Sequence, residues 1–238
     1  MSCPWFHVPS LPTAGGSVTL DRDEARHALG VRRLGAGDAV TLFDGEGSVA
    51  DAVIAAGRDR SGGTVVHVTG VRRAARPALE IVAALAPPKG DRWATALDML
   101  AQLSVDSVVP IDAEFGVVEA AAINRPRAER ILLEACKQSR SAWRTVLGES
   151  SRLADFVRAQ RDAGRQVALA DAAGGPIDAV IGDRIAFAVG PEGGFSVTER
   201  AAALEAGARP VSIGSSVLRV ETAAVAMAAA FRARSAGQ

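Results

Sequence analysis

The chain has 238 residues, 48% of them hydrophobic, and its 27 basic residues balance 27 acidic ones. A chain of this length and composition can bury one large core or two smaller ones, which excludes a disordered protein. Because the net charge is zero, any nucleic-acid binding must come from a local positive patch and not from the field of the whole molecule.

The two cysteines, Cys3 and Cys136, lie far apart in the sequence, so we expect neither a disulfide framework nor a zinc site. Prolines interrupt the N-terminal region where a signal peptide would need a continuous apolar stretch. The longest apolar run, Ala223 to Phe231, is too short to span a bilayer. These features predict a cytoplasmic protein with no metal and no membrane segment.

The first part of the chain alternates short apolar runs with glycine and aspartate, a pattern typical of a small β-barrel or sandwich. One helix, over 21–34, interrupts the strands, with Asp21 and Glu24 in capping-box spacing. A hairpin turn is predicted over 44–47. Strands are predicted over 17–20, 39–43, 48–54 and 64–69, and the domain is expected to span residues 1–74.

From residue 75 onward, strands and helices alternate, which predicts an α/β domain over 75–238 with a mostly parallel sheet and helices on both faces. Ser196 and Glu199 have capping-box spacing, and Gly207 suits the end of that helix. Strands are predicted over 79–86, 107–111, 166–170, 185–189 and 210–213. Helices are predicted over 92–103, 126–139, 151–163, 196–207 and 221–232.

The stretch "GPEGG", Gly190 to Gly194, follows a predicted buried strand, where ligands of parallel sheets bind. Its glycines would let a ligand approach the backbone. It matches neither the P-loop motif, GxxxxGK followed by Ser or Thr, nor the dinucleotide-binding motif GxGxxG, and Glu192 would repel phosphate. A ligand with an amine, a neutral heteroaromatic ring or a sulfonium therefore suits the loop better. An ordinary sharp turn between strand and helix is the alternative.

A second loop, "IGSSVLRVETAA", repeats this design from Ile213. Arg219 stands among apolar residues and would need a partner if it were buried. Glu221 suits the first turn of a helix, which could be its whole role.

Near the N-terminus, Arg26, His27, Arg32 and Arg33 could form one basic helix face for RNA, or an ordinary solvated surface.

Together, "GPEGGFSVTE" and "IGSSVLRVETAA" resemble the paired C-terminal motifs of the RsmE family, the 16S ribosomal RNA uracil-N3 methyltransferases of the SPOUT superfamily. Two weaker matches are "HALGVRRLGAGDAVTLFDGEG", similar to the RNA-binding segment of the family, and "EACKQSRSAW", similar to its central motif. The resemblance implies an N-terminal PUA-like β-barrel, then a SPOUT domain with a deep trefoil knot and a mostly parallel sheet.

The resemblance also implies that the knot loops hold S-adenosyl-L-methionine, and that the protein is a homodimer through its last helix, acting on 16S rRNA in the small ribosomal subunit. It favours RNA contacts at Arg26, His27, Arg32, Arg33 and, through the central motif, Arg140. The cofactor residues implied by position are Leu169, Gly190, Glu192, Gly193, Ile213, Gly214, Ser216, Val217 and Leu218.

For catalysis, Arg219 is expected to stabilise the charge that develops on the uracil oxygens, and Glu221 to orient Arg219 or accept a proton through water. An extruded base needs a stacking partner, for which Phe195 and Trp143 are candidates, although core packing is the alternative.

The chain departs from the family pattern at Lys137, Arg140, Ser141 and Ser216, more on the RNA-facing side than in the cofactor loops. A SPOUT methyltransferase for another RNA position, including ribose 2′-O, and a non-catalytic RNA-binding or ribosome-assembly protein are the alternatives.

Overall fold

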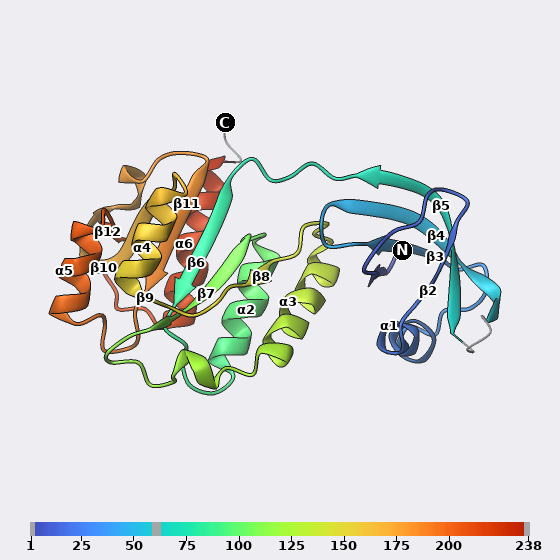
Figure 1. Cartoon of the computed structure of the whole chain (residues 1–238), viewed down its shortest axis with the longest axis horizontal. Coiled ribbons are helices and arrows are strands. Elements are labelled where there is room, and N and C mark those ends of the chain that lie inside the picture. Colours follow the sequence, from blue (N-terminus) through green and yellow to red (C-terminus); the bar gives the residue numbers. More distant parts are fainter. Residues whose placement is uncertain (1–2, 59–62, 236–238) are drawn as a thin grey trace. The chain divides into compact units, whose positions relative to one another are not determined.

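A computed structural model describes residues 3–58 and 63–235 (Figure 1). The chain divides into two compact units. The first contains Met1–Arg76 and a later segment, Cys136–Arg144, and the second contains Pro77–Ala135 and Thr145–Gln238.

The first unit is built on a five-stranded sheet with the order β1-β3-β4-β5-β2. Strand β1 runs parallel to β3, and the other neighbours are antiparallel. All four predicted strands are present, and β1 was not predicted because three residues are too few to show alternation. The strands are β1 (Trp5–His7), β2 (Ser17–Thr19), β3 (Ala39–Phe43), β4 (Ser48–Arg58) and β5 (Thr64–Arg73).

Helix α1 (Arg22–Arg26) begins at Asp21, whose carboxylate accepts hydrogen bonds from the backbone N–H groups of Asp23 and Glu24. The helix continues as a π-helical segment, His27–Val31, and ends there, so the prediction of one helix to residue 34 was too long. Arg33 has a φ of 55°, a left-handed conformation that a helix cannot continue through.

The predicted turn at 44–47 is confirmed, and it also binds the later segment of the first unit. Asp44 Oδ1 accepts from the N–H groups of Glu46 and Ser48. The N–H of Gly47 donates to Ala142 O, and the N–H of Arg144 donates to Gly45 O. Residues 142–144 therefore pack as an extended segment along the hairpin.

The second unit contains a parallel sheet with the order β12-β10-β11-β6-β7-β8, and β9 also pairs with β7. This confirms the mostly parallel sheet. Its strands are β6 (Glu80–Leu85), β7 (Ser107–Asp112), β8 (Val146–Leu147), β9 (Ser151–Arg152), β10 (Gln166–Pro176), β11 (Arg184–Val189) and β12 (Arg209–Ser212). Its helices are α2 (Arg92–Gln102), α3 (Arg125–Ser139), α4 (Leu153–Asp162), α5 (Val197–Glu205) and α6 (Val220–Ser235).

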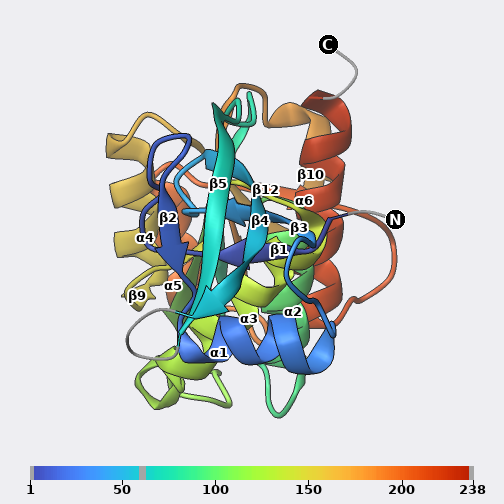
Figure 2. The same cartoon turned by 90° about the vertical axis from the view of Figure 1, so that its right-hand side faces the viewer.

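Helices cover both faces of this sheet, as the alternation of side chains along β11 requires. Ala186 and Ala188 join a core cluster with Phe156 of α4 and Ala203 of α5. Phe187 points the other way and packs against Phe231 of α6, with ring centroids 6.2 Å apart. Figure 2 shows α4 and α5 on one side of the sheet and α6 with α2 on the other.

Local signals predicted most of these elements correctly, including the capping box of Ser196 and Glu199, where both hydrogen bonds are present. Two differences come from strand pairing. Ser151 and Arg152 form β9 beside β7 before α4 begins, although a helix was predicted from residue 151. Strand β10 runs on to Pro176 because, after a register shift past Ala170, it pairs again with β12.

Candidate cofactor site and RNA-facing residues

A cavity of about 780 Å³, including space open to solvent, lies at the carboxyl ends of β11 and β12 and at the register shift of β10 that follows Ala170. These strands are neighbours and parallel, so the loops that follow them meet at one edge of the sheet. The volume is within the range of small-molecule sites. The lining residues are Ala170, Asp171, Ala172, Val189, Gly190, Pro191, Glu192, Gly194, Phe195, Val211, Ser212, Ile213, Gly214, Ser216, Val217, Leu218, Val220 and Ala223.

Glycine suits the shape of the loop after β11 at two positions. A methyl group on Gly190 would lie 3.0 Å from Phe195 Cδ2 and 3.2 Å from Phe195 N. Gly194 has a φ of 73°, and its N–H donates to Pro191 O at 2.8 Å. The loop is therefore a tight turn that places its backbone at the cavity wall.

The loop after β12 supplies the other wall and is exposed. Ser212 Oγ donates to Gly214 O at 2.9 Å, which fixes the start of the loop. Val217 and Leu218 line the cavity, yet 93% and 37% of their surfaces are exposed. Apolar side chains held at the mouth of a cavity in this way are suited to covering a bound ring.

Most of the predicted cofactor residues line this cavity: Gly190, Glu192, Ile213, Gly214, Ser216, Val217 and Leu218. Two do not. The Leu169 side chain is buried in the core between the sheet and α4, because strand alternation turns it away from Ala170, which does line the cavity. Gly193 faces Phe115, whose Cβ would lie 3.4 Å from a methyl group on the glycine.

Asp171 also lines the cavity, although it was not among the predicted cofactor residues. Its carboxylate accepts a hydrogen bond from Arg200 Nε at 2.7 Å. Burial alone would raise the pKa of Asp171, but the Arg200 hydrogen bond and charge, with the N–H of Ala173, outweigh it, and the pKa lies below its usual value. Asp171 follows the predicted end of β10, so position after a strand was the available signal.

The second carboxylate at the cavity, Glu192, forms an ion pair with Arg92 at 3.0 Å. Each side chain is 41% exposed, so solvent screens much of this attraction. The pair joins the loop after β11 to the first residue of α2.

Arg219 and Glu221 flank the start of α6. The Arg219 side chain is exposed, and within residues 3–58 and 63–235 no hydrogen bond or ion pair joins its guanidinium to another group. Glu221 is partly buried, and its Oε2 atom is buried with no hydrogen-bond partner among the described residues. Arg219 therefore does not need the buried partner that its apolar neighbours suggested, and it faces solvent.

The predicted RNA-binding residues all belong to the first unit. Arg26, Arg32, Arg33 and Arg140 are exposed, whereas His27 is partly buried. Arg26 forms an ion pair with Asp23 on α1, and Arg32 Nε lies 3.4 Å from His27 Nε2. Arg140, with a φ of 56°, follows the end of α3.

The two candidate stacking residues differ in their surroundings. Phe195 lines the cavity and packs against the core cluster beneath it. Trp143 belongs to the first unit. The guanidinium carbons of Arg73 and Arg76 lie 4.9 and 5.1 Å from the centroid of its ring. Its Nε1 donates to Ala75 O. Trp143 thus forms a basic and aromatic cluster with these two arginines.

Within the part of the chain that the structure describes, no group of three or more His, Cys, Asp or Glu residues could hold a metal ion. No helix among these residues is both long enough and apolar enough to cross a bilayer.

The sequence matches a family model for an RNA methyltransferase domain over residues 75–232, and one for an RNA methyltransferase PUA domain over residues 20–62. A ribosomal RNA small subunit methyltransferase E from Mycobacterium bovis is 32% identical, with 92% of this chain and 87% of that protein covered.

Two solved structures share the whole fold. A ribosomal RNA small subunit methyltransferase E from Neisseria gonorrhoeae, bound to S-adenosyl methionine, is 25% identical with a TM-score of 0.87, and 98% of each chain is covered. A probable rRNA-methyltransferase from Porphyromonas gingivalis is 33% identical with a TM-score of 0.84, and 98% of this chain and 99% of that chain are covered. These similarities confirm the resemblance seen in the two C-terminal motifs, and the chain belongs to the ribosomal RNA small subunit methyltransferase E (RsmE) family.

Proposed function

We propose that this protein transfers a methyl group from S-adenosyl-L-methionine to N3 of a uridine in 16S rRNA of the small ribosomal subunit. Family membership supports the reaction class and the substrate. The observation that carries the proposal is that the two sequence motifs, Gly190 to Glu199 and Ile213 to Ala224, form opposite walls of one cavity. Motifs in separate parts of the chain thus build a single site.

The residues at this cavity fit S-adenosyl-L-methionine. Apolar groups, including Val217 and Leu218, suit the adenine ring, and the tight glycine turn presents backbone groups to it. Asp171 and Glu192 put two carboxylates beside a ligand whose sulfonium and amino groups are positive. We propose that Gly190, Glu192, Ile213, Gly214, Ser216, Val217 and Leu218 hold it, with Leu169 and Gly193 supporting the site from behind the wall.

When bound, S-adenosyl-L-methionine supplies an electrophilic methyl group on its sulfonium. The N3 proton of uracil must leave, and negative charge then spreads onto the ring oxygens. We propose that Arg219, which is exposed beside the cavity loop, stabilises this charge. Glu221 has one buried carboxylate oxygen that no group in the described part of the chain hydrogen-bonds, which supports a role in accepting the N3 proton through water.

For RNA docking, we propose that the first unit binds phosphates through Arg26, Arg32, Arg33 and Arg140, with His27 beside them. Four of these side chains are exposed guanidinium groups, which suit bidentate contacts with phosphate. In this proposal residues 1–74 form the RNA-binding domain and residues 75–238 the methyltransferase domain.

We also propose a deep trefoil knot in the second unit and a homodimer through α6. The chain passes from β12, at one edge of the sheet, back across the sheet to pack α6 on β11 and β6, which supports threading. Small, partly exposed residues of α6, including Ala226, Ala229 and Ala230, would allow a second subunit to approach closely. The proposed compartment is the cytoplasm.

Methylation of assembled small subunits and of naked 16S rRNA, followed by mass-spectrometric mapping of the product, tests the function. We expect one N3-methyluridine. A methyl group on ribose 2′-oxygen or on another base would replace this proposal with a different RNA position. Calorimetry that detects no S-adenosyl-L-methionine binding would favour a non-catalytic RNA-binding protein.

Arg219→Ala tests the catalytic assignment. We expect kcat to fall by about 10²- to 10³-fold, the usual effect of removing one charge-stabilising donor, while cofactor affinity changes little. Arg158→Ala is the matched control, because Arg158 is an exposed arginine on α4 that pairs only with Asp155 in the same helix among the described contacts. Equal kcat values for the two variants would remove Arg219 from the mechanism.

A further inference from the structure

A second cavity, of about 580 Å³, lies beyond the carboxyl end of β6 in the second unit. Its walls are largely apolar: Pro87 and Pro88 follow the strand, and Trp93 and Ile123 are partly buried beside them. Strand β6 pairs with β11, so this cavity and the cofactor cavity open at the same edge of the sheet. Of the residues that the structure describes, none lines both cavities.

Two helices begin at this second cavity. Trp93 lies in the first turn of α2, and Arg127 lies in the first turn of α3. Asn124 caps α3, because its Oδ1 accepts the N–H of Arg127 at 3.0 Å. Helix N-termini carry partial positive charge, and the exposed Arg127 guanidinium adds a full one, which the Asp91 carboxylate at 3.5 Å partly offsets. The cavity is therefore electrostatically suited to a ligand rich in hydrogen-bond acceptors.

Trp93 carries an independent signal. Its indole Nε1 is buried, and no group among the described residues accepts its hydrogen bond. A buried N–H without a partner destabilises the folded protein, so such a group requires an explanation. A carbonyl oxygen of a ligand in the cavity that reached this N–H would satisfy it.

An ion pair joins α2 to the wall of the cofactor cavity. Arg92, the residue before Trp93, binds Glu192 at 3.0 Å, and Glu192 lines the cofactor cavity. A substrate that lies along this edge of the sheet would therefore meet both sites. The apolar walls suit a flat ring, the N–H donors suit its carbonyl oxygens, and Arg127 suits a phosphate.

We propose that the second cavity binds one nucleotide of the RNA substrate, with a uracil-type base between Trp93 and the two prolines and its phosphate at Arg127. The inference rests on the proposed function. The nucleotide is either the target itself or its neighbour in the strand, and both have the same chemistry.

The test is Trp93→Phe, which keeps an aromatic ring but removes the N–H donor together with part of the indole. The KM for RNA is expected to rise roughly tenfold, as for one lost buried hydrogen bond, while cofactor affinity does not fall. A decrease in kcat as well assigns the cavity to the target nucleotide, and an unchanged kcat assigns it to a neighbour. Arg127→Gln should weaken RNA binding and its salt dependence, whereas Arg130→Gln, one turn away on α3, should not.

Direct binding of a uridine-containing RNA fragment separates this inference from the proposed function. If the wild-type protein binds RNA in a Trp93-dependent way but transfers no methyl group, the proposed methyl transfer is wrong and the nucleotide site in the second cavity stands. Normal methyl transfer with an unchanged KM in Trp93→Phe, and with Arg127→Gln equal to Arg130→Gln, would overturn the cavity assignment alone.

Discussion

Lys137 Nζ donates hydrogen bonds to both carboxylate oxygens of Glu24, at 2.8 and 3.0 Å. Both side chains are only 7% exposed, so this is a buried ion pair within the first unit. It fixes residues 136–139, the end of α3 that belongs to the first unit, against α1, which carries Arg26. Glu24 was predicted from its spacing to complete a helix cap at Asp21, and its carboxylate binds Lys137.

Lys137→Met is expected to destabilise the protein by roughly 3–5 kcal/mol, because it leaves the Glu24 charge buried without its cation. Urea unfolding measures the loss. The exchanged pair, Lys137→Glu with Glu24→Lys, should recover part of it. A loss below about 1 kcal/mol in Lys137→Met would mean that water reaches Glu24.

Gly174→Ala is expected to destabilise the protein by roughly 1–3 kcal/mol and to weaken cofactor binding. A methyl group there would lie 2.5 Å from the backbone N of Val211 in β12, and Val211 lines the cofactor cavity. Gly175→Ala is the matched control, since its methyl group would meet nothing within 4 Å. Calorimetry measures the affinity of each variant for S-adenosyl-L-methionine, and thermal unfolding measures its stability. Equal affinities and equal melting temperatures for the two variants would contradict the packing argument.

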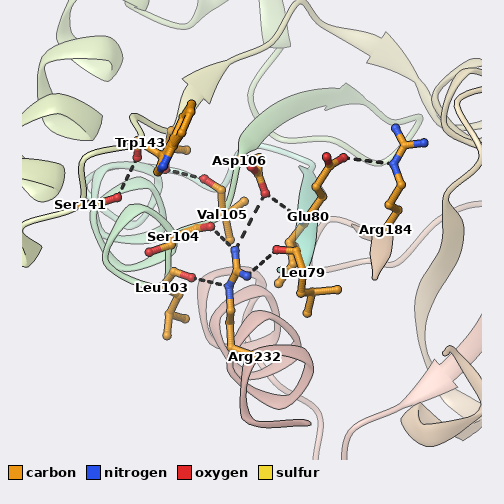
Figure 3. A network of polar contacts seen from close by, with 12 residues as sticks. Leu79, Glu80, Leu103, Ser104, Val105, Asp106, Ser141, Trp143, Arg184 and Arg232 are labelled. Atoms are coloured by element: carbon orange, nitrogen blue, oxygen red, sulfur yellow. Dashed lines mark hydrogen bonds and ion pairs between the residues drawn. The ribbon is translucent and has the colours of Figure 1, made fainter. Parts of the chain in front are cut away.

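Arg232 of α6 anchors the end of α2 (Figure 3). Its Nε donates to Leu103 O at 3.0 Å and its Nη1 to Leu79 O at 2.5 Å, and its Nη2 donates to Ser104 O. Burial lowers the pKa of the guanidinium, and the Asp106 carboxylate opposes that shift. These carbonyls include groups at the C-terminal end of α2, which cannot bond within their own helix.

Arg232→Met should therefore destabilise the protein by about 3 kcal/mol, since charged hydrogen bonds to several carbonyls are lost together. Arg158→Met, at an exposed position of α4, should change the free energy of unfolding by less than about 0.5 kcal/mol. Chemical denaturation measures both variants. The anchor has no energetic role if the two values agree.

Stability should fall in acid partly because of Asp171. Its pKa is lowered in the folded protein from the ordinary value of 3.8, so the stabilisation is complete above 3.8 and is lost as the pH falls through the folded value. Asp171→Asn should be less stable than wild type at pH 7, and the difference should shrink below pH 3.8. Urea unfolding of both proteins across this pH range measures the difference in their free energies of unfolding. A difference that does not change with pH would contradict the role of the Asp171 carboxylate.

The arginines of the first unit should bind RNA through phosphate. Replacing Arg32 by Gln should weaken RNA binding at low salt and reduce the slope of log K against log salt by about 1. Arg33→Gln should act similarly. Arg158→Gln should leave both the RNA affinity and the slope unchanged. If RNA affinity fell equally in this control, the effect would come from the net charge of the protein and not from a contact of Arg32 or Arg33 with phosphate.

The sequence determined those features that depend on neighbouring residues. Continuous apolar runs such as Ile185 to Val189 predicted buried parallel strands, and Ser196 with Glu199 predicted the start of α5. The two C-terminal motifs predicted which loops would meet at a cavity. These signals are local, because hydrogen bonds of helix caps and the period of a strand involve residues within a few positions.

Tertiary structure alone decided which distant groups pair and which way each side chain points. Nothing local to Glu24 indicates Lys137, and nothing local to Leu169 shows that it faces the core while Ala170 faces the cavity. The short strands β8 and β9 form only because β7 offers them an edge. Such contacts depend on how the whole chain closes its loops and fills its core, so sequence spacing carries no signature of them.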